Sequence, residues 1–336
     1  MKPFCVLCLL FLFGCTTQPP QPTITPSSVP TLASPTAPTA TNLPISRPSG
    51  HPTNRLTDLP TIRPPDIPTN RPTDPILVGA GDIAVCDAQG DEATARLLDN
   101  LEGIVFTLGD NVYPNGSPEQ FQKCYEPTWG RHKARTYPVP GNHDYNTGGA
   151  KGYYDYFGAR AGDPKKGYYA YDVGAWRIIA LNSEMDTGEN SAQVQWLRDD
   201  LAQHPTQCAL AMFHRPLFSS GPHGRDGGGE KTRVFWQVLY ENNADVILNG
   251  HDHDYERFAP QDPNGKADAA RGIREFVVGT GGGVPYAFGE IKPNSEARRA
   301  GRFGVLKLTL RATSYDWEFI AVTGALFGDS GRGECH

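Results

Sequence analysis

Six residues with metal-binding side chains are spaced along the chain so that five of them follow apolar segments within two residues. They are Asp82, Asp110, Asn142, His214, His251 and His253. Carboxylates neutralise and bridge hard cations, neutral imidazoles suit Zn, Fe and Mn, and an amide oxygen is a neutral ligand. The set offers enough donors for two metal ions if Asp110 bridges them. Two ions about 3.5–4 Å apart clamp the attacking and leaving oxygens of a phosphoryl group and lower the pKa of bound water toward about 7.

The elements that position these residues are predicted to be strands. Asp82, Asp110, Asn142, His214 and His251 each stand at the end of an apolar run. In open α/β sheets the carboxyl ends of the strands form the crevice in which ligands bind. A single Asp after a strand is typical of a helix cap or a turn. Five runs that deliver Asp, Asp, Asn, His and His to one edge indicate a shared site instead.

Short apolar runs alternate with helical patterns from Ile76 onward. A strand at 76–80, a helix at 91–101 and a strand at 104–108 form the strand–helix–strand pattern of a parallel crossover. Two further helix-plus-strand pairs are predicted at 192–201 with 208–213, and at 234–242 with 245–248. Runs suited to antiparallel strands cover 168–173, 176–181, 273–278, 303–310 and 315–322. The strand count indicates two packed sheets flanked by helices.

The first fifteen residues are predicted to be a signal peptide (1–15). Lys2 supplies a positive n-region, and the apolar run that follows is too short to span a bilayer. The segment Leu12–Cys15 (LFGC) resembles a bacterial lipobox, in which Cys15 is lipidated and becomes the new N-terminus. An ordinary secretory signal cleaved nearby is the alternative. Both interpretations predict export.

Residues 16–75 contain more than half of the 30 prolines, interleaved with Thr, Ser and Asn. This composition lacks the apolar residues of a core and favours extended polyproline geometry, so we predict a disordered stalk at 16–75. The stalk would hold an ordered domain, residues 76–336, away from the membrane to which Cys15 is tied. We expect a lipoprotein on the outer face of a bacterial membrane, or otherwise a secreted protein.

The formal net charge of −6 over 336 residues argues against nucleic acid as a partner, because phosphate backbones recruit basic surfaces. It argues equally against binding to an anionic membrane, so membrane contact is expected only through the lipid anchor. We expect a monomer that acts on a small phosphorylated substrate.

Four cysteines remain after the signal peptide and the lipidated residue are set aside: Cys86, Cys124, Cys208 and Cys335. An even number in an oxidising compartment favours disulfides. Four cysteines allow three pairings, of which we favour Cys86–Cys124 with Cys208–Cys335. No two of them have a CxxC-type spacing, so a metal site built from these sulfurs is not expected.

Five motifs occur in order along the ordered domain: Gly81-Asp82, Gly109-Asp110-Asn111, Gly141-Asn142-His143-Asp144, Phe213-His214 and Gly250-His251-Asp252-His253. This set resembles that of the calcineurin-like metallophosphoesterases, over roughly residues 76–323. The resemblance implies a mixed α/β fold, specifically a four-layer αββα sandwich with two central mixed β-sheets. It also makes residues 76–336 a metallophosphoesterase catalytic domain.

Two details narrow the resemblance to the purple acid phosphatases of the small, tartrate-resistant type. Many metallophosphoesterases have Asp-x-His in the first motif, with the histidine as a metal ligand, but Ala84 occupies that position here. The second motif continues to Tyr113 and resembles GDxxY, in which the tyrosine binds Fe(III) as a phenolate and replaces the missing histidine. The alternative is that Tyr113 packs at the sheet edge and binds no metal.

The resemblance implies a role for each matched residue. Fe(III) would be held by Asp82, Asp110, Tyr113 and His253. Fe(II), Zn or Mn would be held by Asp110, Asn142, His214 and His251. His143, oriented by Asp144, would stabilise the phosphoryl charge or protonate the leaving group, and His223 would be a second histidine on the substrate side.

A glycine-rich run and two further histidines are not expected to bind metal. The run 279–283 (GTGGG) lacks a Walker lysine and is predicted to form a rim loop near the metals. His132 and His204 lie in polar stretches and are predicted to be on the surface.

The expected activity is hydrolysis of phosphate monoesters by in-line attack of a metal-bound hydroxide, which makes the chain a hydrolase acting on phosphoric esters. One alternative is a phosphodiesterase or nucleotidase with Zn or Mn in both sites and Tyr113 uninvolved. A more distant alternative is a surface lipoprotein that binds a ligand without turnover. Retention of His143, which has no evident purpose in a binding module, favours the enzyme.

Overall fold

The computed structural model describes residues 74–225, 228–322 and 327–336. The predicted signal peptide, the lipidation at Cys15 and all but the last two residues of the predicted stalk lie outside the described residues. Within them, no helix combines the length and the apolar character needed to cross a membrane.

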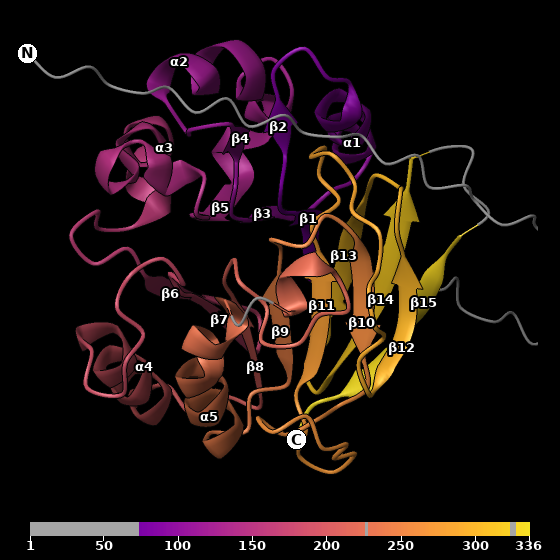
Figure 1. Ribbon diagram of the computed structural model, residues 1–336. Coiled ribbons are helices and arrows are strands. Elements are labelled where there is room, and N and C mark those ends of the chain that lie inside the picture. Colours follow the sequence, from indigo (N-terminus) through magenta and orange to yellow (C-terminus); the bar gives the residue numbers. More distant parts are fainter. Residues whose placement is uncertain (1–73, 226–227, 323–326) are drawn as a thin grey trace, which may run out of the picture. The chain divides into compact units, whose positions relative to one another are not determined.

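One sheet has six strands in the order β15-β14-β13-β1-β3-β5 (Figure 1). Its strands are β1 (Ile76–Ala80), β3 (Ile104–Leu108), β5 (Thr136–Val139), β13 (Gly304–Leu310), β14 (Ser314–Ala321) and β15 (Asp329–Glu334). The strands β1, β3 and β5 run parallel, and β13, β14 and β15 extend the sheet with antiparallel pairing. The parallel half is the crossover predicted from the sequence.

A second sheet has seven strands in the order β12-β10-β11-β9-β8-β7-β6. Its strands are β6 (Tyr169–Val173), β7 (Trp176–Ala180), β8 (Cys208–Met212), β9 (Val246–Asn249), β10 (Tyr255–Phe258), β11 (Arg274–Val278) and β12 (Ser295–Arg299). The strands β7, β8, β9 and β11 are parallel, whereas β6, β10 and β12 pair antiparallel at the two sides. Both sheets are therefore mixed.

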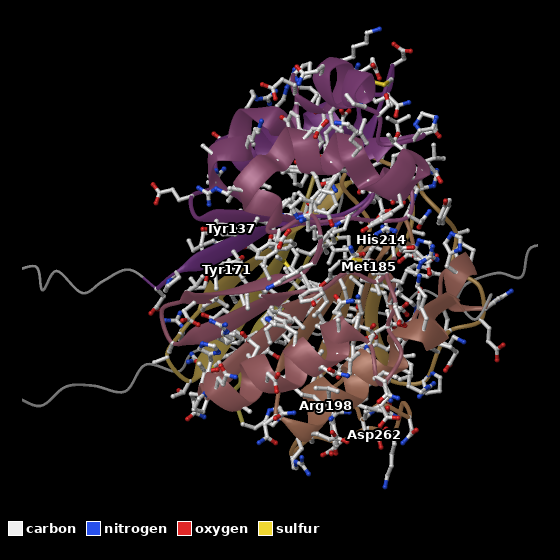
Figure 2. All side chains as sticks on the ribbon, turned by 90° about the vertical axis from the view of Figure 1, so that its left-hand side faces the viewer. Tyr137, Tyr171, Met185, Arg198, His214 and Asp262 are labelled. Atoms are coloured by element: carbon white, nitrogen blue, oxygen red, sulfur yellow. A yellow bond between two sulfur atoms is a disulfide. The ribbon has the colours of Figure 1, made fainter. Side chains whose placement is uncertain are left out.

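Helices cover the outer faces of the two sheets (Figures 1 and 2). The longer ones are α1 (Gly90–Asp99), α3 (Lys151–Phe157), α4 (Ala192–Gln203) and α5 (Arg233–Glu241). A short α2 (Pro118–Gln120) leads into a π-helix at Phe121–Tyr125. Short 3₁₀ helices occupy Trp129–Arg135, Asp144–Asn146, Gly148–Ala150, Gly158–Ala161, Pro222–Gly224 and Gly228–Thr232. The helices α1–α3 lie beside the six-stranded sheet, and α4 and α5 lie beside the seven-stranded one, which gives the predicted αββα layers.

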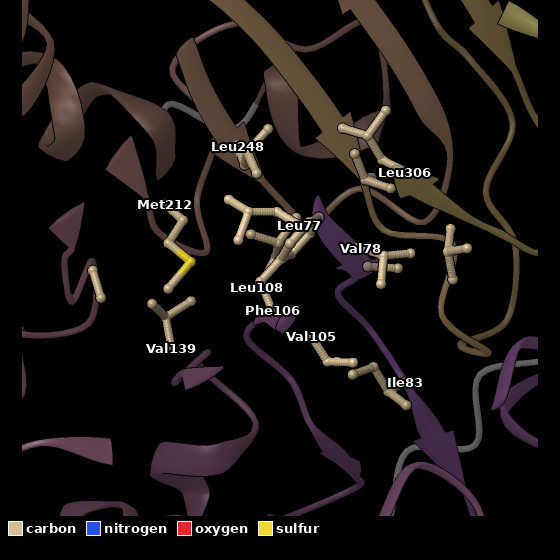
Figure 3. Packing of buried hydrophobic residues seen from close by; sticks show 14 of the residues in the cluster. Leu77, Val78, Ile83, Val105, Phe106, Leu108, Val139, Met212, Leu248 and Leu306 are labelled. Carbon is tan, nitrogen blue, oxygen red and sulfur yellow. The ribbon is translucent and has the colours of Figure 1, made fainter. Parts of the chain in front are cut away.

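The apolar core has two parts because successive strand residues point to opposite faces of a sheet. On β7, Ile178 belongs to the cluster between the sheets, and the next residue, Ile179, belongs to the cluster beneath α4 and α5. Figure 3 shows the first cluster, where Leu77 of β1 lies near Leu248 of β9. Contacts of this kind hold the two sheets face to face and fix where their strand ends meet.

Two disulfides fasten connections to the sheets. They join Cys86 to Cys124 and Cys208 to Cys335, the pairing favoured from the sequence. The first lies beside a two-stranded parallel sheet of β2 (Ala84–Val85) and β4 (Val112–Tyr113). The second closes a loop of 127 residues and ties the last described segment to β8.

The pairing of two strands differs from the prediction. The segments around β7 and β11 were expected to be antiparallel, yet β7 pairs parallel with β8, and β11 pairs parallel with β9. Both are buried on nearly every residue, which is typical of a parallel strand, although Arg177 interrupts the apolar residues of β7 and Arg274 and Glu275 begin β11. The strands β5, β10, β12 and β15 and the helix α3 were not predicted.

Candidate metal centre

The six-stranded and seven-stranded sheets present the carboxyl ends of five parallel strands to one region. Asp82 follows β1, Asp110 follows β3, Asn142 follows β5, His214 follows β8, and His251 follows β9. The predicted ligands thus come from both sheets, and the packing of the two sheets determines the distances between them.

The backbone at three of these ligands is strained. Asp82, Asp110 and His251 have φ values of +59°, +49° and +72°, a region that costs a residue with a Cβ roughly 1–2 kcal/mol. Each follows a glycine, and the left-handed turn directs the side chain back across the strand end. Strain of this kind persists only where the surroundings enforce it, and it clusters at functional sites.

The motif glycines allow the loops to nest against one another. A Cβ on Gly109 would lie 2.5 Å from Nδ1 of His214, and a Cβ on Gly250 would lie 2.6 Å from Oδ2 of Asp82. Each glycine therefore makes room for a ligand contributed by a different motif.

Three potential metal-binding atoms surround the hydroxyl oxygen of Tyr113 and form a group of four with it. Its oxygen lies 2.9 Å from Oδ1 of Asp82, 3.2 Å from Oδ2 of Asp110 and 2.9 Å from Nε2 of His253. His253 donates from Nδ1 to the carbonyl of Val284 at 2.7 Å, so its Nε2 presents a lone pair to the group. Two carboxylate oxygens, a phenol oxygen and an imidazole nitrogen thus lie together, a set of ligand atoms that fits a cation among them.

The charges around Tyr113 support the same conclusion. Burial, together with the carboxylates of Asp110 and Asp82, raises the pKa of Tyr113 well above its usual value. Without a cation the residue stays a neutral phenol. A bound trivalent ion would offset the carboxylates and favour the phenolate.

A second group of donors surrounds Nε2 of His214. This atom lies 3.1 Å from Oδ1 of Asn142, 3.1 Å from Nδ1 of His251 and 3.4 Å from Oδ2 of Asp110. His214 donates from Nδ1 to the carbonyl of Leu108 at 2.7 Å, which leaves Nε2 as the atom available to a metal. One ligand atom from each of Asp110, His214 and His251 lies within 4.8 Å of the other two, close enough to share a metal ion.

Asp110 belongs to both groups through one oxygen. Its Oδ2 approaches both Tyr113 and His214, while its Oδ1 accepts a hydrogen bond of 2.7 Å from the backbone N–H of His143. In spite of burial, His214 and His143 lower the pKa of Asp110 to about 2. Asp110 in turn raises the pKa of His214 to about 10, again against burial. The protein alone thus holds a proton where a metal ion would sit, and such a proton is released when metal binds.

His143 lies at the open side of this centre. Its ring packs at 4.5 Å from that of Tyr113, and Nε2 lies 3.9 Å from Oδ2 of Asp110. Nδ1 donates to the carbonyl of Pro114 at 2.8 Å. The prediction that Asp144 orients His143 is wrong, because the backbone carbonyl of Pro114 has that role.

Asp144 is fully buried and serves the loop behind His143. Its carboxylate accepts hydrogen bonds from the backbone N–H groups of Asn111 and Gly141 and from the side chain of Asn111. Burial and the charge of Asp110 raise the pKa of Asp144 to about 7. It ties the second motif to the third and does not reach the reacting region.

His223 stands on the side of the centre formed by His251. Its ring stacks on that of His251 at 4.1 Å, and its backbone N–H donates to Oδ1 of Asp252 at 3.0 Å. The structure therefore brings His223 next to the second group of ligands. It does not by itself assign a role to the side chain.

Three neighbours of the centre were missed from the sequence. Tyr286 stacks on His253 with ring centroids 4.0 Å apart. Arg215 donates to Nε2 of His251 at 2.9 Å and pairs with the buried Glu184. The position of Arg215 directly after a ligand was a signal that could have found it, whereas Glu184 and Tyr286 lie in loops without a recognisable pattern.

The predictions for the glycine-rich run 279–283 and for His132 have different outcomes. Gly283 of the run 279–283 donates to the carbonyl of Asp82 at 2.7 Å, so this loop packs on the first motif as a rim. The prediction of a surface position is wrong for His132, which is buried with Nε2 3.3 Å from the carbonyl of Ala95. Its ring fills space between α1 and the following 3₁₀ turn, which its polar neighbours in the sequence do not indicate.

The folded sheets and the donor groups define a class of protein, the calcineurin-like phosphoesterases. The chain matches the model of that family over residues 77–255, more than half of its length, and belongs to the family. The family depends on two metal ions, in agreement with the two donor groups that share Asp110.

Within this class the chain is similar to purple acid phosphatases. It is 29 % identical over 143 residues to purple acid phosphatase 18 of Arabidopsis thaliana, a match that covers 41 % of this chain and 32 % of that protein. It is 28 % identical over 257 residues to the probable inactive purple acid phosphatase 27 of the same plant, which covers 64 % and 41 %. The chain thus spans about a third to two fifths of the length of these relatives.

Solved structures show the same fold. Purple acid phosphatase PPD1 from yellow lupin (Lupinus luteus) seeds superposes with a TM-score of 0.61 at 20 % identity, covering 77 % of this chain and 53 % of that one. A dimetal phosphatase from Danio rerio gives 0.54 at 14 % identity, covering 79 % and 100 %. GAP50, the anchor in the inner membrane complex of Plasmodium, gives 0.59 at 13 % identity and covers 79 % and 90 %. The fold hosts enzymes and an anchor alike, so activity has to be argued from the site.

Proposed function

We propose that this chain is a phosphomonoesterase of the purple acid phosphatase type that works with two metal ions. The observation that carries the proposal is the single oxygen, Oδ2 of Asp110, that belongs to both donor groups. A binding module with one ion needs no such bridge, whereas a pair of ions that share a phosphoryl group does.

The donor chemistry supports different ions at the two positions. Asp82, Tyr113 and His253, with Asp110, would hold Fe(III), because a phenolate and two carboxylates suit a hard trivalent cation. Asn142, His214 and His251, with Asp110, would hold Fe(II), Zn or Mn. When bound, the two ions lower the pKa of water and neutralise charge on the phosphoryl group.

His143 would supply the proton or the positive charge that the reaction needs. Its Nδ1 proton is committed to the carbonyl of Pro114, so Nε2 is the atom that faces the reacting region. A proton held there stabilises charge on a phosphoryl oxygen or passes to the departing alkoxide. The packing of the ring on Tyr113 keeps Nε2 in place.

The test is hydrolysis of an aryl phosphate by the protein loaded with iron and zinc. Asn142→Ala and His251→Ala are expected to lose at least 100-fold in kcat/KM and to bind less metal. His204→Ala, a change at a half-exposed histidine directly after α4, is the control and is expected to match the wild type. Wild-type rates in folded Asn142→Ala and His251→Ala proteins would refute the proposal.

The metal assignment has a separate test in the visible spectrum. An Fe(III)–phenolate pair absorbs visible light, so we expect a broad band that disappears in Tyr113→Phe, with about one iron per chain. A colourless protein with two Zn or Mn ions would contradict this assignment. It would favour a phosphodiesterase or nucleotidase in which Tyr113 binds no metal.

We further propose that the chain is exported and tethered through Cys15 as a monomer. The two disulfides support an oxidising compartment. Expression of the full chain in a bacterium should place it in the membrane fraction, and Cys15→Ala should release it. A wild-type chain recovered only in the soluble fraction would favour an ordinary secretory signal.

A further inference from the structure

Three charged side chains form a cluster beside the ligand His251. Glu184 follows β7, Arg215 follows the ligand His214, and Lys231 lies in the 3₁₀ turn before α5. Nε of Arg215 donates to both oxygens of Glu184, at 2.9 and 3.1 Å, and Nζ of Lys231 lies 3.4 Å from Oε2 of the same carboxylate. Figure 2 labels His214 and Met185, the sequence neighbours of Arg215 and Glu184, close together between the upper and lower helices.

The cluster has more positive charge than its carboxylate neutralises. One glutamate serves two cations, and its side chain is only 7 % exposed. Arg215 is 18 % exposed and Lys231 is 36 % exposed, so both cations reach solvent beside the metal centre. The cluster of Arg215, Lys231 and Glu184 is thus partly desolvated and has a net charge of +1, in a protein whose overall charge is −6.

Metal binding at His251 would change the contacts of Arg215. In the structure its Nη1 donates to Nε2 of His251 at 2.9 Å. A neutral imidazole that binds a metal through Nδ1 must carry its proton on Nε2. That proton and the guanidinium are both donors, so Nη1 would lose its acceptor if His251 bound a metal through Nδ1. The guanidinium would keep its Glu184 contact through Nε, and Nη1 would be left beside His251 to donate to another acceptor.

We propose that Arg215 and Lys231 form a subsite for a second phosphoryl group, so that the preferred substrates are phosphate esters or anhydrides whose leaving group is itself phosphorylated. The inference rests on the proposed phosphoesterase function and specifies the class of substrate that the enzyme would prefer. A guanidinium with a free edge and an ammonium held by a shared carboxylate are the groups that bind a phosphoryl dianion.

A purely structural role for the cluster makes a different prediction. If Arg215 and Lys231 only stabilise the loop around Glu184, their loss lowers stability and affects every substrate alike. If they bind a second phosphoryl group, the loss falls on substrates that carry one. The ratio of two substrates therefore separates the roles.

The experiment measures kcat/KM for inorganic pyrophosphate and for phenyl phosphate with the metal-loaded protein. In Lys231→Met and in Arg215→Gln the ratio of pyrophosphate to phenyl phosphate should fall about tenfold or more, the loss expected for one charge-assisted hydrogen bond. Lys307→Met is the matched control, because Lys307 also pairs with a glutamate, Glu318, at 3.8 Å on the six-stranded sheet. Its ratio should equal that of the wild type.

Calorimetric binding provides a second measurement that does not depend on turnover. Methylenediphosphonate should bind the wild type more tightly than methylphosphonate, and Lys231→Met should remove most of the difference. Equal binding of the two, or a ratio that changes less than twofold in both variants, would overturn the subsite. If neither substrate is hydrolysed, the proposed function fails, and the binding comparison still decides the subsite.

Discussion

The close approach of Gly141 to Asp110 allows a sharp test of how the metal centre is assembled. A Cβ at position 141 would lie 2.2 Å from Oδ1 and 2.4 Å from the backbone nitrogen of Asp110. Contacts this short cannot be kept, so Gly141→Ala must push the Asp110 loop aside. Overpacking of this kind costs about 1–3 kcal/mol. For a domain of this size, that corresponds to a fall in Tm of roughly 2–12 °C.

The effect on activity should exceed the effect on stability. Asp110 supplies the oxygen shared by both donor groups, and a displacement of about 1 Å at such a position costs about 100-fold in rate. We expect Gly141→Ala to remain folded, to bind less than two metal ions per chain and to lose about 100-fold in kcat/KM on an aryl phosphate. The measurements are metal analysis, thermal unfolding and steady-state kinetics on the same preparation.

Gly148→Ala is the matched control for this substitution. Gly148 lies seven residues further along the same connection, and a Cβ there would meet no atom within 4 Å. Its variant should differ from the wild type by less than about 0.5 kcal/mol and keep full activity. A Gly141→Ala protein with normal metal content and normal rates would show that the Asp110 loop moves without consequence. The reasoning about the nested motif loops would then be wrong.

Three further substitutions test the domain away from the metals. Arg177→Met should lower the free energy of unfolding by about 3–5 kcal/mol in chemical denaturation, because it leaves the buried Asp200 without the partner that lies 2.5 and 3.0 Å away. Burial raises the pKa of Asp329, but the guanidinium of Arg257 outweighs it, so the pKa is lowered on balance. The ion pair therefore contributes its full share to the free energy of unfolding above about pH 4, and this share is lost as the pH falls further. Asp329→Asn should therefore lower Tm at pH 7 and flatten its fall under acid conditions. Tyr125→Phe should leave Tm equal or slightly higher, since the buried hydroxyl of Tyr125 has no hydrogen-bond partner among the described residues.

The strands that precede the predicted ligands could be predicted because the pattern that indicates them lies within each segment. The runs 76–80 and 104–108 are apolar, are bounded by Gly-Asp and flank an amphipathic helix, and the structure places β1 and β3 at the same bounds. Boundaries elsewhere shifted by one or two residues, as at α4, which continues to Gln203. Local periodicity contains this information without reference to the rest of the chain.

The missed strands lack such a signal. β12 (SEARR) and β15 (DSGRGE) are polar and half-exposed, and they exist as strands because β10 and β14 offer them unpaired edges. Their hydrogen bonds, supplied by the neighbouring strand, decide the conformation against weak intrinsic preference. A prediction made from one segment alone cannot take the neighbouring strand into account.

The same division between local and distant information applies to the metal centre. The types of the predicted ligands, and the position of five of them after strands, could be read from the sequence. The structure brings these five together with Tyr113 and His253. What orients them is backbone that the sequence does not mark: the carbonyl of Leu108 fixes His214, that of Val284 fixes His253, and that of Pro114 fixes His143. Any residue can supply a carbonyl, so its identity leaves no trace in the motif. The Asp144 assignment, which was implied by the resemblance of the third motif, is wrong for this reason, because a backbone oxygen 29 residues away from His143 accepts the hydrogen bond from its ring.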